Sequence, residues 1–337
     1  MRGEGRLGTT ESSSSDRVIA PVVSVMIMVY NHERYLAEAI SSVLEQDVDF
    51  PMEVLIGEDC SSDRSRQIAL DFERQFPTVV RVISGQSNVG AFQNARRLIV
   101  AARGEFIAYL DGDDFWMPGK LRRQVEALRS RPDCSAVFSN AKVVDHSGEE
   151  IGRFNDVGDA ELSLSDMLQA GNFLHTSSML FRGSLKGAIL SLNNEFIDFR
   201  LHLELAKYGS LRQLSAFLSA YRVNTESSMV ANDNTKVREL YWQAVLSVDR
   251  SKVTDREYCL GIADFLRRVL FRSIAVRNFK LFAGWWKRAS EDLPCDSWRL
   301  AWFLVTRSLR VGGLLVIDRL RSWPRHAGRT DRVLYHR

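Results

Sequence analysis

Three carboxylates, those of Asp111, Asp113 and Asp114, follow directly after an apolar run at residues 105–110. Carboxylates this close repel one another unless a cation, a partner arginine or solvent lies among them. Asp111 and Asp113 are two positions apart, so both can face one hard cation, and the intervening Gly112 lets a ligand approach the backbone. Mg²⁺ and Mn²⁺ take oxygen ligands and keep positions open for phosphate oxygens. The cluster therefore predicts a divalent-metal site for a diphosphate, with a polar strand-end turn as the alternative.

Apolar runs alternate with helical patterns through the part of the chain that must position this cluster. Strands are expected at residues 22–30, 52–56, 79–84, 105–110 and 135–144. Helices are expected between them, at the apolar stripe that starts at Leu36, after Cys60, at 91–102 and after Pro118. This alternation predicts an α/β fold in which a mainly parallel sheet is covered by helices on both faces.

Polar residues follow three of the expected strands. Tyr30 comes after the first, Glu58 and Asp59 after the second, and the acidic cluster after the fourth. In open sheets of this class, ligands bind beyond the carboxyl ends of the strands, so these groups should share one crevice. No G-x-G-x-x-G follows the first strand and no P-loop motif is present, which argues against a nicotinamide dinucleotide enzyme and a P-loop NTPase.

Three blocks, in this order, resemble the family 2 glycosyltransferases: VSVMIMVYNHERYLAEAISSVLEQ, EVLIGEDCSSDRSRQI and NVGAFQNARRLIVAARGEFIAYLDGDDFWMPGKLRRQ. The last contains the D-x-D motif of that family. The resemblance covers roughly residues 22–145. It implies a nucleotide-diphospho-sugar transferase of the GT-A fold that uses a divalent metal and inverts the anomeric centre. The expected context is the synthesis of polysaccharide, O-antigen or another cell-surface glycan.

The resemblance also implies a donor site, whose members contact the nucleotide or its diphosphate: Val29, Tyr30, Asp59, Asn94, Arg96, Asp111, Gly112 and Arg222. Val29 and Tyr30 would flank the nucleobase, and Asp59 would bind its edge. Asp113 would be the principal ligand of Mn²⁺ or Mg²⁺, with Asp111 assisting.

A transferase of this kind needs a general base that takes the proton of an acceptor hydroxyl. Residues 195–224 resemble the second half of the family, with an acidic turn ahead of a helix. The resemblance places the base on Asp198, with Glu195 as the substitute, whereas a helix N-cap is the structural alternative for Asp198. Two roles are expected for His175. It contacts the sugar or the acceptor, or it is a buried histidine whose ring nitrogens are hydrogen-bonded within the protein.

The sequence leaves two other functions open. One is a protein that binds a nucleotide or sugar without catalysis. The other is a phosphohydrolase with Asp111 as nucleophile and Asp113 as acid, although that class normally carries its D-x-D early in the fold and not on a fourth strand.

The chain is expected to have a disordered leader at 1–20, a GT-A domain at 21–235 and a basic helical region at 236–337. Within the GT-A domain, residues 21–145 would form the nucleotide-sugar half and 146–235 the acceptor half. The last region has 21 Lys and Arg against 10 Asp and Glu, which suits either a solvated charged face or an anionic membrane surface.

Four scattered cysteines indicate neither a disulfide framework nor a zinc site. No signal peptide or spanning segment is evident, so the expected location is the cytoplasm, at the inner face of the cell membrane. The expected partners are a nucleotide sugar and a glycan or lipid-linked glycan, with no nucleic acid.

Overall fold

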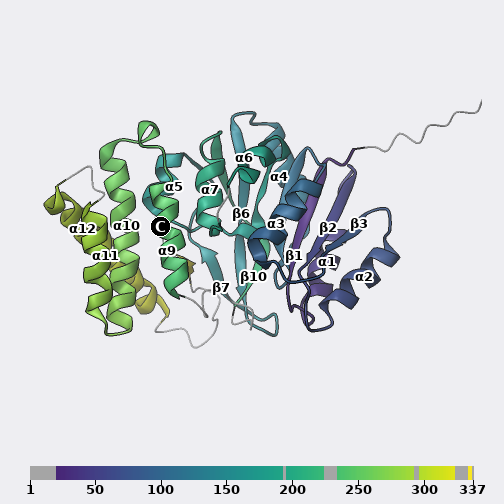
Figure 1. The fold of residues 1–337 in the computed structure, drawn as a ribbon, viewed down its shortest axis with the longest axis horizontal. Helices are drawn as coiled ribbons and strands as arrows, with labels where there is room; N and C mark the ends of the chain where they lie inside the picture. Colours follow the sequence, from purple (N-terminus) through teal and green to yellow (C-terminus); the bar gives the residue numbers. More distant parts are fainter. Residues whose placement is uncertain (1–19, 193–194, 224–233, 292–295, 323–332, 336–337) are drawn as a thin grey trace, which may run out of the picture.

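The computed structural model describes residues 20–192, 195–223, 234–291, 296–322 and 333–335 (Figure 1). The side chains of residue 312 and of residues 314–322 are not part of that description. The leader expected at 1–20 lies, except for its last residue, outside the described residues.

The strands form one sheet with the order β11-β7-β6-β9-β4-β1-β2-β3, and β5, β8 and β10 pair off this path. In chain order they are β1 (Val23–Val29), β2 (Met52–Glu58), β3 (Val80–Ser84), β4 (Phe106–Asp111), β5 (Phe115–Trp116), β6 (Cys134–Val144), β7 (Glu150–Asn155), β8 (Ala160–Leu162), β9 (Leu180–Arg182), β10 (Ser210–Arg222) and β11 (Val333–Tyr335). Strands β4, β1, β2 and β3 run parallel, whereas β9 is antiparallel to both β4 and β6.

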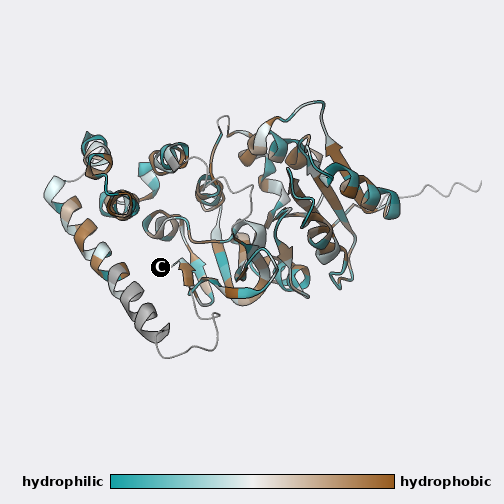
Figure 2. Cartoon of the chain, turned by 90° about the horizontal axis from the view of Figure 1, so that it is seen from below, coloured by the Kyte–Doolittle hydropathy of each residue, from teal (hydrophilic) through white to brown (hydrophobic). Residues whose placement is uncertain are grey.

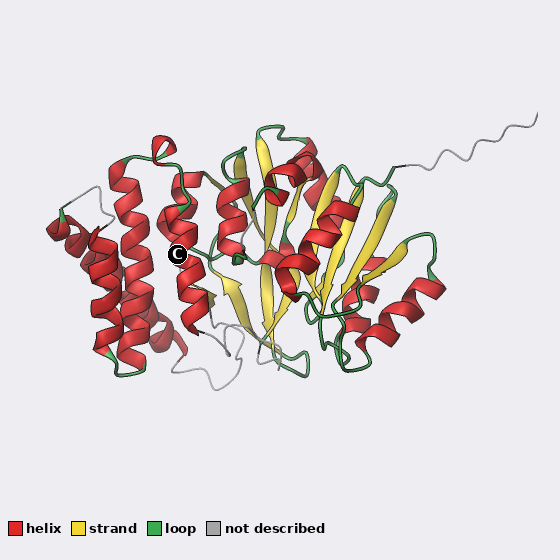
Figure 3. Ribbon diagram, viewed as in Figure 1, coloured by secondary structure: helices red, strands yellow, loops and turns green. Residues whose placement is uncertain are grey.

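The α-helices are α1 (Leu36–Leu44), α2 (Ser65–Gln75), α3 (Gly90–Ala101), α4 (Lys120–Arg129), α5 (Leu164–Ala170), α6 (Lys186–Leu190), α7 (Asp198–Leu205), α9 (Asn234–Leu246), α10 (Asp255–Ala275), α11 (Phe279–Glu291) and α12 (Ser297–Ser322). Short 3₁₀ turns are η1 (Thr176–Ser178), η2 (Gly183–Leu185) and η3 (Arg250–Lys252). Figure 3 shows the sheet between these helices, which gather beyond its β7 side toward the end of the chain.

The predicted strands and helices before residue 145 are confirmed, with ends that differ by one or two residues for the strands and for α3. The periodicity of β1 explains the layers. Val25 and Ile27 pack on one face with residues of α1, α2 and α4, whereas Met26 and Met28 pack on the other with residues of α3, α5 and α7. Alternate side chains of a strand point to opposite faces, so a strand that is apolar throughout is covered on both sides. The α/β fold with helices on both faces is therefore confirmed.

The region after residue 235 is helical where the structure describes it, except for β11. Trp242 of α9 is fully buried in the same apolar core as α5 and α7, and α10 packs on α5, α11 and α12. Strand β11 pairs parallel with β7, with Val333 opposite Arg153, and three residues are too few for a sequence pattern to indicate. The division of the chain into domains stays a prediction.

The sequence indicates no disulfide framework, but one of the cysteines is disulfide-bonded. Cys259 on α10 is disulfide-bonded, whereas Cys60 and Cys134 are free. A single cross-link leaves no spacing signature of the kind that repeated cysteine motifs have. None of the described helices combines the length and apolar character needed to cross a membrane.

Candidate functional site

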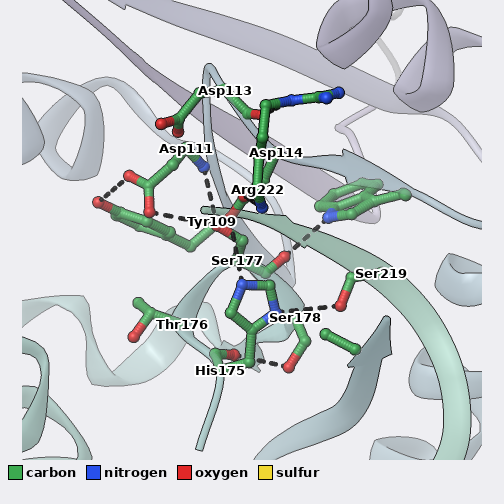
Figure 4. Close-up of polar contacts among 12 residues, drawn as sticks. Tyr109, Asp111, Asp113, Asp114, His175, Thr176, Ser177, Ser178, Ser219 and Arg222 are labelled. Atoms are coloured by element: carbon green, nitrogen blue, oxygen red, sulfur yellow. Dashed lines mark hydrogen bonds and ion pairs between the residues drawn. The ribbon is translucent and has the colours of Figure 1, made fainter. Parts of the chain in front are cut away.

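The turn after β4 carries the acidic cluster, and both oxygens of Asp111 are held there (Figure 4). The Tyr109 hydroxyl donates to Oδ1 at 3.0 Å, and the Ser177 hydroxyl donates to Oδ2 at 3.2 Å. In return, the Asp111 N–H donates to Ser177 Oγ at 3.1 Å. Strand β4 and the turn η1 therefore fix Asp111 together.

The negative charges around Asp111 favour the binding of a cation there. Burial raises the pKa of Asp111 well above its usual range, and the charges of Asp114, Asp113 and Asp198 raise it further. A cation bound at this turn would offset that repulsion, as would a proton on Asp111.

Asp113 is half-buried, and its backbone carbonyl accepts a hydrogen bond from Arg222 Nε at 3.0 Å. Within the part of the chain that the structure describes, no group donates a hydrogen bond to the Asp113 carboxylate. Its backbone is thus held while its side chain remains available to a ligand.

Gly112 is required by the packing of this turn against β1. Its N–H donates to the Met28 carbonyl at 2.8 Å. A Cβ at this position would lie 2.7 Å from His32 Nδ1 and 2.8 Å from the Met28 oxygen, closer than real Cβ contacts come. His32 thus lies directly against the acidic turn, a placement that the sequence reasoning missed because no motif residue marks it.

A metal ion at this turn would have few protein ligands. Among the described residues, no three or more His, Cys, Asp or Glu side chains are arranged to hold a metal. Mg²⁺ is commonly bound through one or two carboxylates together with waters and substrate phosphates. The open carboxylate of Asp113, beside Asp111, fits that mode of binding.

Asp114 is buried and braces the turn from within. Its Oδ1 accepts the Arg222 N–H at 2.8 Å, and its Oδ2 lies 3.1 Å from His175 Nε2. His175 Nδ1 lies 3.1 Å from Ser219 Oγ (Figure 4). Burial lowers the pKa of His175 to about 3, so the ring is neutral at physiological pH. Of the two roles expected for His175, the structure therefore shows the second, a buried histidine whose two ring nitrogens both have hydrogen-bond partners.

The guanidinium of Arg222 is committed to contacts within the protein. Besides Asp113, it donates to the Asp145 carbonyl at 2.9 Å and to Glu38 at 2.7 Å, and it lies over the Tyr35 ring at 4.4 Å. Arg222 therefore holds the turn that carries Asp113. The contact with a diphosphate expected from the sequence would require some of these interactions to be exchanged.

The residues predicted to bind the nucleobase lie where β1 and β2 end. The Asp59 N–H donates to the Val29 carbonyl at 3.0 Å, and Tyr30, which follows, is exposed. The Asp59 carboxylate accepts the Gly90 N–H at 2.8 Å, at the start of α3, and pairs with Arg97 at 2.8 Å. The structure therefore brings Val29, Tyr30 and Asp59 to one edge of the sheet.

Asn94 and Arg96 are held elsewhere. The Asn94 amide is buried between α3 and β2, where it donates to the Gly57 carbonyl at 2.6 Å. Arg96 donates to the Leu190 carbonyl at 2.6 Å, at the end of α6. Its neighbour Arg97 is the arginine that reaches Asp59. The contacts of both predicted residues thus point away from the acidic turn.

Asp198 lies at the start of α7, and the residue as a whole is exposed. Crowding by protein displaces water from its carboxyl group and so raises the pKa of Asp198, and a hydrogen bond from Thr176 partly offsets the effect. Its charge in turn raises the pKa of Asp111, which places the two carboxyl groups in one electrostatic environment. Ile197, not Asp198, is the N-cap of the helix. Glu195 is exposed and pairs with Lys236 at 2.8 Å.

A residue distant in sequence joins this region. Strand β11 places Tyr335 against Phe154, with ring centroids 4.8 Å apart, and Phe154 contacts His175 at the same separation. Burial raises the pKa of Tyr335, and the charge of Asp198 contributes to the shift. Tyr335 is thus close enough to Asp198 to feel its charge, and no local motif could have indicated this placement.

The family model described as glycosyl transferase family 2 matches residues 24–187, a segment that contains the acidic turn and the strands around it. Residues 24–187 form a glycosyltransferase family 2 domain. The resemblance seen in the sequence is therefore confirmed.

Proteins similar to this chain cover it to different extents. An uncharacterized protein of Mycobacterium bovis is 31% identical over 201 residues, which are 59% of this chain and 58% of the relative. This chain therefore spans less than two thirds of that protein. The UDP-Glc:alpha-D-GlcNAc-diphosphoundecaprenol beta-1,3-glucosyltransferase WfgD of Escherichia coli is 29% identical over 224 residues, 66% of this chain and 85% of the relative.

The fold of this chain resembles that of S. aureus TarS 1–349, solved in complex with UDP-GlcNAc. The TM-score is 0.53 at 16% identity, and the match covers 80% of this chain and 92% of the TarS chain. At this identity the likeness bears on the fold alone, and it supports the GT-A architecture.

Proposed function

We propose that this family 2 protein is an inverting, metal-dependent hexosyltransferase that moves a sugar from a nucleotide diphosphate to a hydroxyl of a glycan or lipid-linked glycan. The observation that carries the proposal is the open carboxylate of Asp113 on a braced turn, beside Asp111, whose pKa the charge of Asp198 helps to raise. The names of the similar proteins support it: WfgD is a glucosyltransferase with UDP-Glc as donor and alpha-D-GlcNAc-diphosphoundecaprenol as acceptor, and TarS was solved with UDP-GlcNAc. These names suggest the synthesis of cell-surface glycans.

In this proposal the donor lies along the carboxyl edge of β1, β2 and β4. Val29, Tyr30 and Asp59 contact the nucleobase, and the backbone at Gly112 lets the diphosphate approach. Asp113, with Asp111, would hold Mn²⁺ or Mg²⁺. When bound, the metal supplies positive charge that stabilises the departing diphosphate.

Asp198 is the proposed general base. Its carboxylate takes the proton of the acceptor hydroxyl as that oxygen forms a bond to the anomeric carbon. The bond from the anomeric carbon to the diphosphate oxygen breaks in the same displacement, so the configuration at that carbon inverts. Because crowding raises the pKa of Asp198, the group is a stronger base than an ordinary aspartate.

A nucleotide-binding screen by calorimetry tests the proposal. UDP, GDP, TDP and CMP are each titrated with Mn²⁺, Mg²⁺ or a chelator. We expect one nucleoside diphosphate to bind, only with metal, and the matching nucleotide sugar to be consumed when acceptor is added. Binding without transfer to any acceptor would favour a binding protein. Phosphate release from simple phosphomonoesters would favour a phosphohydrolase.

We further propose that the C-terminal helices contact an anionic membrane surface at its cytoplasmic side. Helix α12 lies at the outer edge of the molecule, opposite β1–β3 (Figure 2). Trp298, Trp302, Val305 and Leu309 recur at helical spacing and are between 50% and 71% exposed. Exposed tryptophans beside arginines are typical of helices that lie in a membrane interface.

The substitution Trp302→Glu is expected to reduce cosedimentation with vesicles of phosphatidylglycerol by about tenfold, because a carboxylate at the interface loses apolar contact and is repelled by the lipid. Tyr208→Glu serves as the control, since Tyr208 is also an exposed aromatic residue but precedes β10, outside the C-terminal helices. Equal vesicle binding by both variants and the native chain would count against membrane contact through α12.

A further inference from the structure

A cavity of about 810 Å³ lies between α5, α10, α12 and the residues that follow β7. None of the residues proposed for sugar transfer lines it. Its lining residues include the apolar Val157, Leu260 and Val311 together with three arginines, Arg267, Arg307 and Arg310. Cavities of this size and mixed lining are typical of small-molecule sites.

The charged wall is built around one buried carboxylate. Asp264 pairs with Arg267 at 2.7 Å and with Arg268 at 2.8 Å, and Arg307 lies 3.9 Å from it. Arg307 also donates to the Gln169 carbonyl at the end of α5. Three guanidinium groups thus surround a single carboxylate, so Asp264 does not neutralise the wall.

Arg310 adds a fourth guanidinium, one helical turn beyond Arg307 on α12. No residue whose side chain the structure describes accepts a hydrogen bond from it or forms an ion pair with it. Of the other carboxylates at the cavity, Asp166 accepts the N–H and the hydroxyl of Ser163 in the cap of α5, and Asp156 lies on the loop after β7. Arg310 is therefore the group with donors left for a ligand.

We propose that this cavity binds a phosphate ester that carries an apolar chain. Guanidinium groups bind phosphate oxygens through paired, charge-assisted hydrogen bonds, which matches the Arg307 and Arg310 wall. The apolar wall would contact the chain and exclude water from it. The inference stands apart from the proposed sugar transfer, because it involves none of the residues of the acidic turn.

The test uses the full chain and three probes, measured by calorimetry: octyl phosphate, inorganic phosphate and octanol. Octyl phosphate is expected to bind more tightly than inorganic phosphate, which lacks the apolar chain, and more tightly than octanol, which lacks the phosphate. Arg310→Gln removes the free guanidinium and should weaken the binding of octyl phosphate by about tenfold. That is the usual cost of losing a charge-assisted hydrogen bond. Val311→Glu places a negative charge in the apolar lining of the same cavity and should weaken the binding of octyl phosphate at least as much.

Arg299→Gln is the matched control, because Arg299 is an exposed arginine of α12 that does not line the cavity. Its affinity for octyl phosphate should equal that of the native chain. Equal affinities in Arg310→Gln, Val311→Glu and the control would overturn the proposal. So would inorganic phosphate or octanol binding as tightly as octyl phosphate. Nucleoside diphosphate binding in the same variants should be unchanged, which separates this result from a failure of the donor site.

Discussion

Asp113→Asn should weaken metal-dependent binding of the nucleoside diphosphate by about a hundredfold and reduce sugar transfer at least as much. The substitution replaces an anionic oxygen by a neutral amide of the same size. A metal that bridges the protein and a diphosphate contributes several kcal/mol, and each 1.4 kcal/mol is a factor of ten in affinity. Because no described group donates to the Asp113 carboxylate, we expect the melting temperature to change little.

Two comparisons make this result specific. Asp47→Asn changes an exposed aspartate that follows α1, at the opposite edge of the sheet, and should leave nucleotide binding unchanged. Asp114→Asn changes a buried carboxyl that accepts the Arg222 N–H, so its main effect should be a lower melting temperature. If Asp113→Asn bound the nucleotide with native affinity in the presence of metal, the proposed donor site would be wrong.

The strands around this site were predictable because their sequence is apolar throughout. Strands β1, β2 and β4 are buried on both faces, so they appear as continuous apolar runs, and their carboxyl ends follow from the parallel topology. By contrast, β5, β8 and β11 are two or three residues long and exist only through their pairing with β10 and β7. Local sequence holds no signal for such elements.

The candidate site was predictable as a set of carboxylates but not as a network. The spacing of Asp111 and Asp113 indicated a cation site, yet it could not show that Asp114 turns inward to His175. Arg222 was expected at the diphosphate from its place in the family pattern. Two of its contacts are with Glu38 and Asp145, which are far from it in the chain. Which of Arg96 and Arg97 faces Asp59 depends on the rotation of α3, which the motif alone does not determine.

The second large effect is expected at Asp198, the proposed general base for the acceptor. Asp198→Asn should lower the turnover number by a factor of about 10² to 10⁴, the usual contribution of a general base, while donor binding stays native. An amide has the size of the carboxylate but cannot take the proton of the acceptor hydroxyl. Glu195→Gln is the matched control, because Glu195 lies three positions away, is exposed and pairs with Lys236. Its turnover should be close to native.

The pH dependence of the native enzyme checks the same assignment. Crowding raises the pKa of Asp198, so the carboxyl becomes protonated, and inactive as a base, at a higher pH than an ordinary aspartate, whose pKa is about 4. Turnover should therefore fall as the pH is lowered through this raised pKa, and the fall should be absent from the residual activity of Asp198→Asn. If Asp198→Asn kept turnover within a few-fold of native, or lost activity at low pH as the native enzyme does, the general base would be another residue. Loss of turnover in Glu195→Gln instead would identify that residue as the base.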